Sequence, residues 1–68
     1  MLKHFDYVIV RQTKDSKVLD YIAAFNSFYD VCYYFADLKN KLEGEYTENT
    51  SKFVSKDGDI IAIRSIQL

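Results

Sequence analysis

The stretch KDGDIIAIRSIQL, residues 56–68, combines a turn pattern with a strand pattern. Asp57 and Gly58 tolerate the positive φ angles of a type I′ hairpin turn, so they predict a tight reversal between two strands. Residues 60–68 are rich in isoleucine and apolar on both alternating faces, which is typical of a strand at the centre of a sheet. We therefore expect a central strand at 60–68 that is entered through a hairpin.

A second stretch with two apolar faces, FDYVIVRQ at residues 5–12, predicts another central strand. The polar cluster at 13–17 follows it, and its Asp15 and Ser16 can bond the nearby backbone and close a turn. Residues 18–25 then resume the strand pattern, so we interpret 5–25 as a β-hairpin. The alternative is one long helix that begins near Ser16, which would give a β-α-β-β order.

Residues 27–44 carry the pattern of a helix. Ser27 followed by Asp30 resembles a capping box, in which the serine oxygen accepts a hydrogen bond from a free amide. Gly44 predicts the end of the helix. An extension back to Val18 would spread apolar groups around the whole circumference, so we favour the shorter helix. Its apolar stripe, at spacings of three and four, consists of Phe28, Val31, Cys32, Phe35, Leu38 and Leu42.

Residues 45–55 are polar, which is typical of a solvated edge strand. The predicted order is β-β-α-β-β: one α+β domain over residues 1–68, with one helix packed on a four-stranded mixed sheet. A right-handed helical crossover would place the second and third strands at the edges and the first and fourth side by side and parallel at the centre. This layout resembles the β-grasp architecture of ubiquitin-like and immunoglobulin-binding bacterial domains. The resemblance concerns the order and length of the elements and assigns no functional residue.

The composition limits how this domain can be stabilised. A chain of 68 residues buries a thin core, and its single cysteine, Cys32, and single histidine, His4, exclude an intrachain disulfide and a zinc site of several Cys and His ligands. The chain is 49% apolar with six Tyr and five Phe, so we expect dense packing together with a dimer or a bound partner. A net charge of -1 provides no field that attracts nucleic acid or anionic lipid. No signal-peptide pattern or long apolar run is present, so we expect a cytoplasmic protein that does not bind membranes.

Candidates for chemistry are few, and each has a structural explanation. His4 has no second ligand at a suitable spacing, and Cys32 lies within the apolar stripe, where a small thiol packs well. Asp57 and Asp59 flank the hairpin glycine, as expected of a solvated turn. We therefore expect no catalytic residue, no metal and no cofactor, in a protein that is not an enzyme.

A lone helix covers one face of a sheet, so an apolar set of side chains must lie on the other face. Either alternating set could be that one, because Val8 and Val10 are as apolar as the residues between them. The helix tyrosines, Tyr34 among them, either serve an interface or lean over the sheet edges and complete the core. The second strand is an apolar edge that could recruit a second copy. The partner-binding residues we predict are Phe5, Tyr7, Ile9, Arg11, Ile22, Tyr29, Tyr33 and Arg64.

These features predict a small protein-binding or inhibitory module that acts through an apolar sheet face or edge strand, as a homodimer, and that a phage or mobile element could encode. One alternative is binding of single-stranded nucleic acid, with sheet aromatics stacking on bases and Arg11 and Arg64 holding phosphates. The nearly balanced charge counts against that alternative. Another is mimicry of DNA by an acidic face built from Asp37, Glu43, Glu45 and Glu48.

Overall fold

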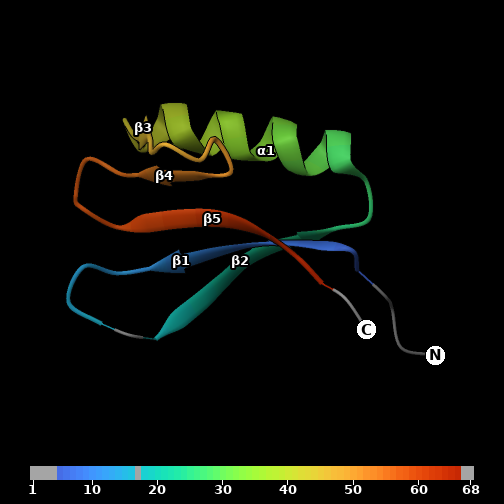
Figure 1. Ribbon diagram of the computed structural model, residues 1–68, viewed down its shortest axis with the longest axis horizontal. Coiled ribbons are helices and arrows are strands. Elements are labelled where there is room, and N and C mark those ends of the chain that lie inside the picture. The colour runs from blue at the N-terminus through green and yellow to red at the C-terminus, as the bar shows by residue number, and fades with distance from the viewer. Residues whose placement is uncertain (1–4, 17, 67–68) are drawn as a thin grey trace.

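One helix lies across one face of a five-stranded antiparallel sheet (Figure 1). The computed structural model describes residues 5–16 and 18–66. The elements are β1 (Tyr7–Gln12), β2 (Leu19–Phe25), α1 (Phe28–Lys41), β3 (Glu45–Tyr46), β4 (Lys52–Val54) and β5 (Ile60–Ser65). Their order in the sheet is β2-β1-β5-β4-β3. The α+β class and the central position of β1 and β5 are confirmed, and the alternative with one long helix is wrong because β2 is a strand.

The sheet has one strand more than predicted, and that strand reverses the direction of β5. Residues 45–55, expected to form a single edge strand, fold back on themselves so that β3 pairs antiparallel with β4. Two side chains hold the reversal: the Thr47 hydroxyl accepts the Asn49 amide at 3.2 Å, and the Asn49 side chain accepts the Ser51 amide at 3.0 Å. Because each added reversal inverts the next strand, β5 runs antiparallel to β1. The predicted mixed sheet with a parallel central pair, as in the β-grasp arrangement, is therefore wrong.

The connection between β4 and β5 is a hairpin, as predicted, but its turn is of another type. Gly58 has a φ of 92°, whereas Asp57 has no positive φ, so the type I′ prediction is wrong. The Gly58 amide donates to the Ser55 carbonyl at 2.9 Å, which closes a three-residue loop with a left-handed glycine bulge. This loop pairs Phe53 with Ile61. A two-residue turn at the same site would shift the register by one residue.

Helix α1 begins at the predicted cap and ends through a different residue. The Ser27 hydroxyl accepts the Asp30 amide at 3.4 Å. At the other end Glu43, and not Gly44, takes the left-handed conformation with a φ of 50°. The Gly44 amide then donates to a carbonyl in the last helical turn at 2.9 Å, as in a Schellman motif. Gly44 is needed for packing, because a Cβ at this position would collide with the ring of Phe53.

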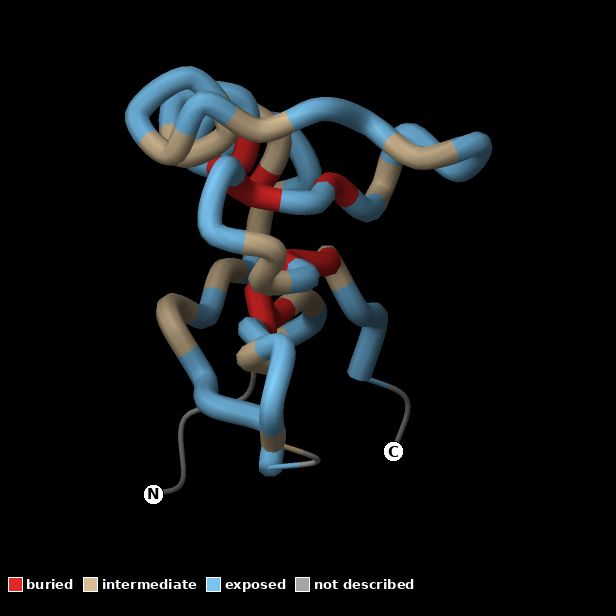
Figure 2. Tube along the Cα trace, turned by 90° about the vertical axis from the view of Figure 1, so that its left-hand side faces the viewer, coloured by how far each residue is buried: buried red, intermediate tan, exposed pale blue. Residues whose placement is uncertain are grey.

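The core lies where α1 meets the central strands, and Figure 2 shows buried residues both beneath the helix and further from it in the sheet. The rings of Phe35 on α1 and Phe53 on β4 pack with their centroids 5.0 Å apart. A second buried set lies on the other side of the sheet and consists of Val8, Val10 and Ala62. The residues of the main core, all 0–3% exposed, are Ile9, Val31, Phe35, Phe53 and Ile61.

Candidate functional site: the uncovered face of the sheet

The structure assigns the alternating residues of β1 to the two faces of the sheet. Ile9 is fully buried beneath α1, and the half-buried Tyr7 has its ring centroid 5.7 Å from that of Phe28 on the helix. Arg11 continues this side of the strand, and its guanidinium pairs with the Asp59 carboxylate at 3.2 Å. Three of the predicted partner-binding residues therefore belong to the covered face, and Ile9 has no exposed surface to offer a partner.

The uncovered face carries apolar side chains from four strands. Its centre is the buried set Val8, Val10 and Ala62, each at most 9% exposed although no helix within residues 5–16 and 18–66 covers them. Tyr21 pairs with Val10 and shares this face, because paired residues of neighbouring strands point to the same side. Its side chain is 76% exposed. The rest of the rim is 36–38% exposed and consists of Leu19, Val54, Ile60 and Ile66.

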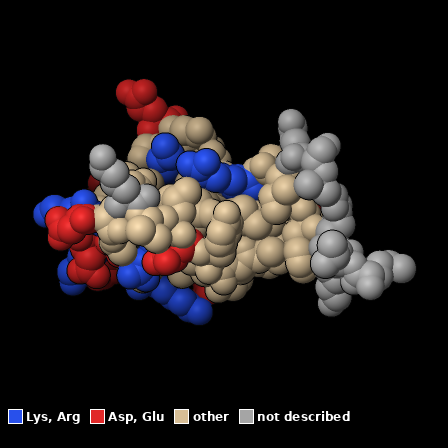
Figure 3. All heavy atoms as spheres, turned by 90° about the horizontal axis from the view of Figure 1, so that it is seen from below, with Lys and Arg blue, Asp and Glu red and all other residues tan. Residues whose placement is uncertain are grey.

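A groove of about 380 Å³ crosses one end of this face. Arg64 is the single charged residue among those that line it, and Tyr21 stands at its rim. Figure 3 views the molecule from the side away from α1 and shows a broad uncharged area with charged groups gathered toward one end. The groove is lined by Val8, Val10, Leu19, Tyr21, Arg64, Ser65 and Ile66.

Two basic side chains on the uncovered face form no ion pair with any residue that the structure describes. Arg64 follows Ala62 by two positions on β5, and Lys52 of β4 pairs with Ala62, so all three share the face. Glu45 on β3 is the one carboxylate placed on the same side by the strand pairing. Beside its apolar groove this face therefore carries two basic groups and Glu45, while Asp6 lies just before β1 with its carbonyl bonded to the Ile66 amide.

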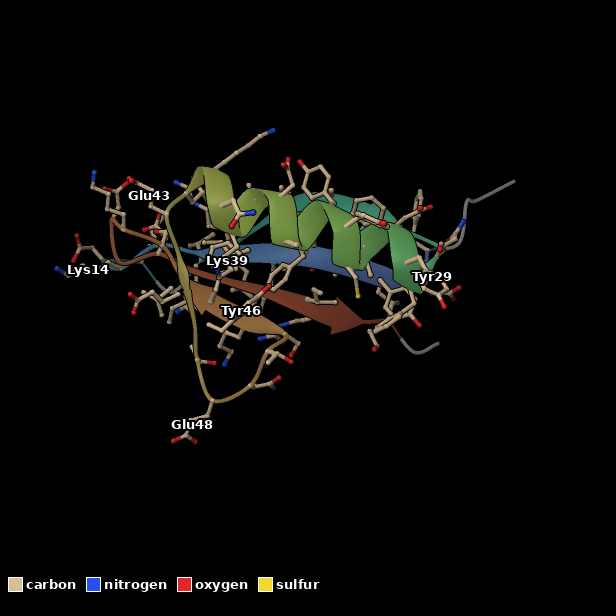
Figure 4. All side chains as sticks on the ribbon, turned by 90° about the horizontal axis from the view of Figure 1, so that it is seen from above. Lys14, Tyr29, Lys39, Glu43, Tyr46 and Glu48 are labelled. Carbon is tan, nitrogen blue, oxygen red and sulfur yellow. The ribbon has the colours of Figure 1, made fainter. Side chains whose placement is uncertain are left out.

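Basic groups elsewhere in the fold are mostly engaged. Lys39 lies over the ring of Tyr46, 4.8 Å from its centroid (Figure 4). A hydrogen bond to the Asp37 carboxylate raises the pKa of Lys41. The ion pairs with exposed partners are Lys41 with Asp37 at 3.0 Å and Lys56 with Glu43 at 3.2 Å.

The helix tyrosines divide between the two roles considered for them. Tyr34 packs its ring 5.3 Å from that of Phe25, centroid to centroid, and so completes the edge of the core. Tyr29, near the start of α1 (Figure 4), and Tyr33 are each 79% exposed, and neither forms a ring contact within the described residues. A depression of about 260 Å³ on this side is lined by Tyr29, Cys32, Tyr33 and Ala36.

Strand β2 lies at an edge of the sheet, as predicted, but its edge is irregular. The register with β1 shifts after Ile9, which leaves Ile22 as the extra residue of a β-bulge, packed against the core. A bulge interrupts the even spacing that an incoming strand needs. A homodimer joined through this edge stays a prediction. The predicted residues thus fall on separate surfaces: Tyr7, Ile9, Arg11 and Ile22 are in or beside the covered layer, Tyr29 and Tyr33 are on the helix, and Arg64 is in the groove. Phe5 is half-buried just before β1.

Sequence reasoning missed Leu19 and Tyr21, which join Arg64 in the groove. No sequence pattern places these two residues in the groove, but Phe53, which stands between Lys52 and a valine, indicates which side of β4 the helix covers. Phe53 is large and apolar, so its ring is expected on the side of the sheet that the helix covers. The residue opposite it on the neighbouring strand must then face the helix too. That neighbour is Ile61, and its assignment sends Arg64 to the uncovered side.

A third hollow, of about 250 Å³, lies between the start of α1 and the end of β5. Its lining includes the hydroxyl groups of Thr50, Ser51 and Ser65 and the thiol of Cys32. None of the described residues that line it carries a carboxylate or an imidazole that could act as a general base. Cys32 packs against the core, as its place in the apolar stripe predicts. His4 lies outside the described residues. Over 5–16 and 18–66, no three His, Cys, Asp or Glu side chains are grouped so as to hold a metal ion.

Comparison of the chain with protein-family models, with curated proteins and with solved structures finds no significant match.

Among the described residues α1, with 14 residues, is the one helix, and it is not long and apolar enough to cross a membrane.

Proposed function

We propose that this chain is a small, non-enzymatic protein-binding module that holds a partner protein on the uncovered face of its sheet. The observation that carries the proposal is the groove between Tyr21 and Arg64, whose floor is apolar and whose rim is half-exposed. A contiguous apolar surface of this kind usually marks an interaction site.

The charges on this face favour a partner segment that combines apolar side chains with a carboxylate. The Arg64 guanidinium, free of an ion pair within the described residues, can hold a carboxylate by two parallel hydrogen bonds. Lys52 adds a second positive charge on the same face. Tyr21 offers a ring and a hydroxyl to the partner, and tyrosine is enriched at the energetic centres of protein interfaces.

Nucleic acid is less well supported as the ligand. Binding of a single strand uses several rings on one open face, whereas Tyr7, Phe25 and Phe53 pack on the helix side of the sheet. Arg11 and Arg64 lie on opposite faces, so they cannot grip one backbone together. The acidic-mimic alternative is weakened as well, because Asp37 and Glu43 are paired with lysines.

A displayed library of random peptides tests the proposal. Selection against the immobilised full chain should enrich sequences that combine apolar residues with at least one Asp or Glu. In fluorescence anisotropy, peptides from the selection should bind the variants Tyr21→Ser and Arg64→Gln about tenfold more weakly than the unchanged protein. Tyr33→Ser is the matched control, because it removes an equally exposed ring from the helix and should leave the affinity unchanged.

The proposal fails if selection enriches no peptide above an unrelated small protein, or if the peptides bind the two groove variants as tightly as the unchanged chain. A labelled oligothymidylate serves as the competing ligand. Micromolar affinity for it that depends on Arg64 and falls steeply with salt would assign the face to nucleic acid instead.

A further inference from the structure

The outward side of α1 carries a stripe of side chains that the fold does not use. Tyr29, Tyr33, Ala36 and Asn40 follow one another at spacings of four, three and four, so they lie on one side of the helix. All four are exposed, whereas Val31 and Phe35 on the opposite side are buried against the sheet. The stripe spans most of the 14-residue helix, which is roughly 21 Å long.

The charges beside this stripe run from negative to positive. Asp30 lies in the first turn, Lys41 in the last turn and Asp37 between them. Their spacings of seven and four place all three on the same flank of the stripe. The flank therefore has opposite charges at its two ends, with the charge at each end suited to the helix dipole.

We propose that a second copy of this chain packs against this stripe, with the two α1 helices antiparallel. A twofold axis that passes between the two helices, level with their midpoints, places Asp30 beside Lys41 of the partner subunit. The same contact repeats on the other side of the axis. Two ion pairs therefore form in each dimer. In a parallel arrangement the charged flanks lie on opposite sides of the helix pair, so no such ion pair forms and the charges favour the antiparallel one. The two Asp37 side chains lie near the axis of the antiparallel pair, and each is held by Lys41 of its own helix.

The shapes of the side chains agree with this arrangement. Tyr33 and Ala36 lie near the middle of α1, one large and one small, and both border the depression on its outward side. In the antiparallel pair each Tyr33 ring fits beside Ala36 of the partner subunit, as a knob enters a hole between packed helices. The stripe is on the opposite side of the domain from the uncovered sheet face, so this dimer stands or falls separately from the proposed function.

Sedimentation equilibrium of the full chain over a wide concentration range tests the dimer. We expect a reversible monomer–dimer equilibrium, and Tyr33→Lys should raise its dissociation constant at least about tenfold. The side chain is 79% exposed, so the variant should fold, which circular dichroism verifies. Tyr21→Lys alters an equally exposed tyrosine on the uncovered sheet face and should leave the dissociation constant unchanged.

Exchange of the charges tests the orientation. Asp30→Lys and Lys41→Glu should each weaken the dimer about tenfold, since each creates two like-charge contacts, and the double variant should recover most of the affinity. Lys41→Glu breaks the ion pair with Asp37 in both the single and the double variant. The difference between the dissociation constants of these two variants therefore reports the contact across the dimer alone.

The proposal would be overturned by a chain that stays monomeric at every concentration, by a dimer that Tyr33→Lys leaves intact, or by a double variant no tighter than Lys41→Glu alone. Dissociation of the dimer by Tyr21→Lys would also overturn it and would assign self-association to the sheet face.

Discussion

The covered and uncovered faces of the sheet come from the same strands, yet they exclude water by different means. On the covered face Ile9, Phe53 and Ile61 are fully buried because α1 lies over them. On the uncovered face Val8 and Val10 are 8% and 3% exposed, and the described residues form no second layer above them. The apolar side chains around them, Leu19, Ile60 and Ile66, are 36–37% exposed. The comparison teaches that the covered face carries the stability of the fold, while the uncovered face is nearly complete as a core and still open to a partner.

The largest effect should come from Phe53→Ala on the covered face. Its ring is fully buried against Phe35, and its removal leaves a cavity that costs about 3–5 kcal/mol. That loss is comparable with the whole stability of a small domain, so the variant should be largely unfolded in urea titrations followed by circular dichroism. Tyr21→Ser removes a ring from the uncovered rim and should change stability by less than about 0.5 kcal/mol. Equal losses in the two variants would contradict the comparison.

A smaller loss of stability is expected when a methyl group is added to the covered face. Gly44→Ala places a methyl group against the Phe53 ring and 3.1 Å from the Val54 carbonyl oxygen, and overpacking of this kind costs about 1–3 kcal/mol. The same substitution in a Phe53→Leu background should cost less, because the colliding ring atoms are gone. Additive losses in the thermal or urea unfolding of the double variant would show that Gly44 is required for another reason.

Among the substitutions at buried positions, the smallest effect should come from Val10→Ala at the centre of the uncovered face. Removal of two buried carbon groups costs about 1.6 kcal/mol by transfer alone, and the half-exposed rim can close over the gap, so we expect about 1 kcal/mol. Urea unfolding measures the loss. A loss as large as that of Phe53→Ala would mean that the uncovered face is as tightly packed as the covered one.

Sequence periodicity was sufficient for the helix and for both central strands, because their patterns are long and are bounded by clear turn residues. The direction of β5 was not predictable, because it depends on how many times the chain reverses before it. The reversal at 47–51 contains neither Gly nor Pro, and it is held by the side chains of Thr47 and Asn49, which also occur in ordinary loops. A turn built on such bonds leaves a weak trace in one sequence.

The assignment of residues to the candidate site depends on the register between β4 and β5, and a shift of one residue would change it. A two-residue turn at Asp57 and Gly58 would have placed Phe53 opposite Ala62, whereas the three-residue loop places it opposite Ile61. That step exchanges the two faces of β5. Since both faces of β1 and β5 are apolar, hydrophobicity could not decide between the registers, and four of the eight predicted partner-binding residues fell in or beside the covered layer.

The central strand pair has a consequence for how the domain forms. Tyr7 lies opposite Ser65, and the Ile66 amide donates to the Asp6 carbonyl at 2.8 Å just beyond this pair. Almost the entire chain must therefore close into one loop before the middle of the sheet exists, and the entropy of that closure opposes its nucleation. A chain emerging from the ribosome can assemble the β1–β2 hairpin and α1 early. It lacks β5, the central strand of the sheet, until residues 60–65 are synthesised. Folding should accordingly be slower than that of an all-helical domain of equal length.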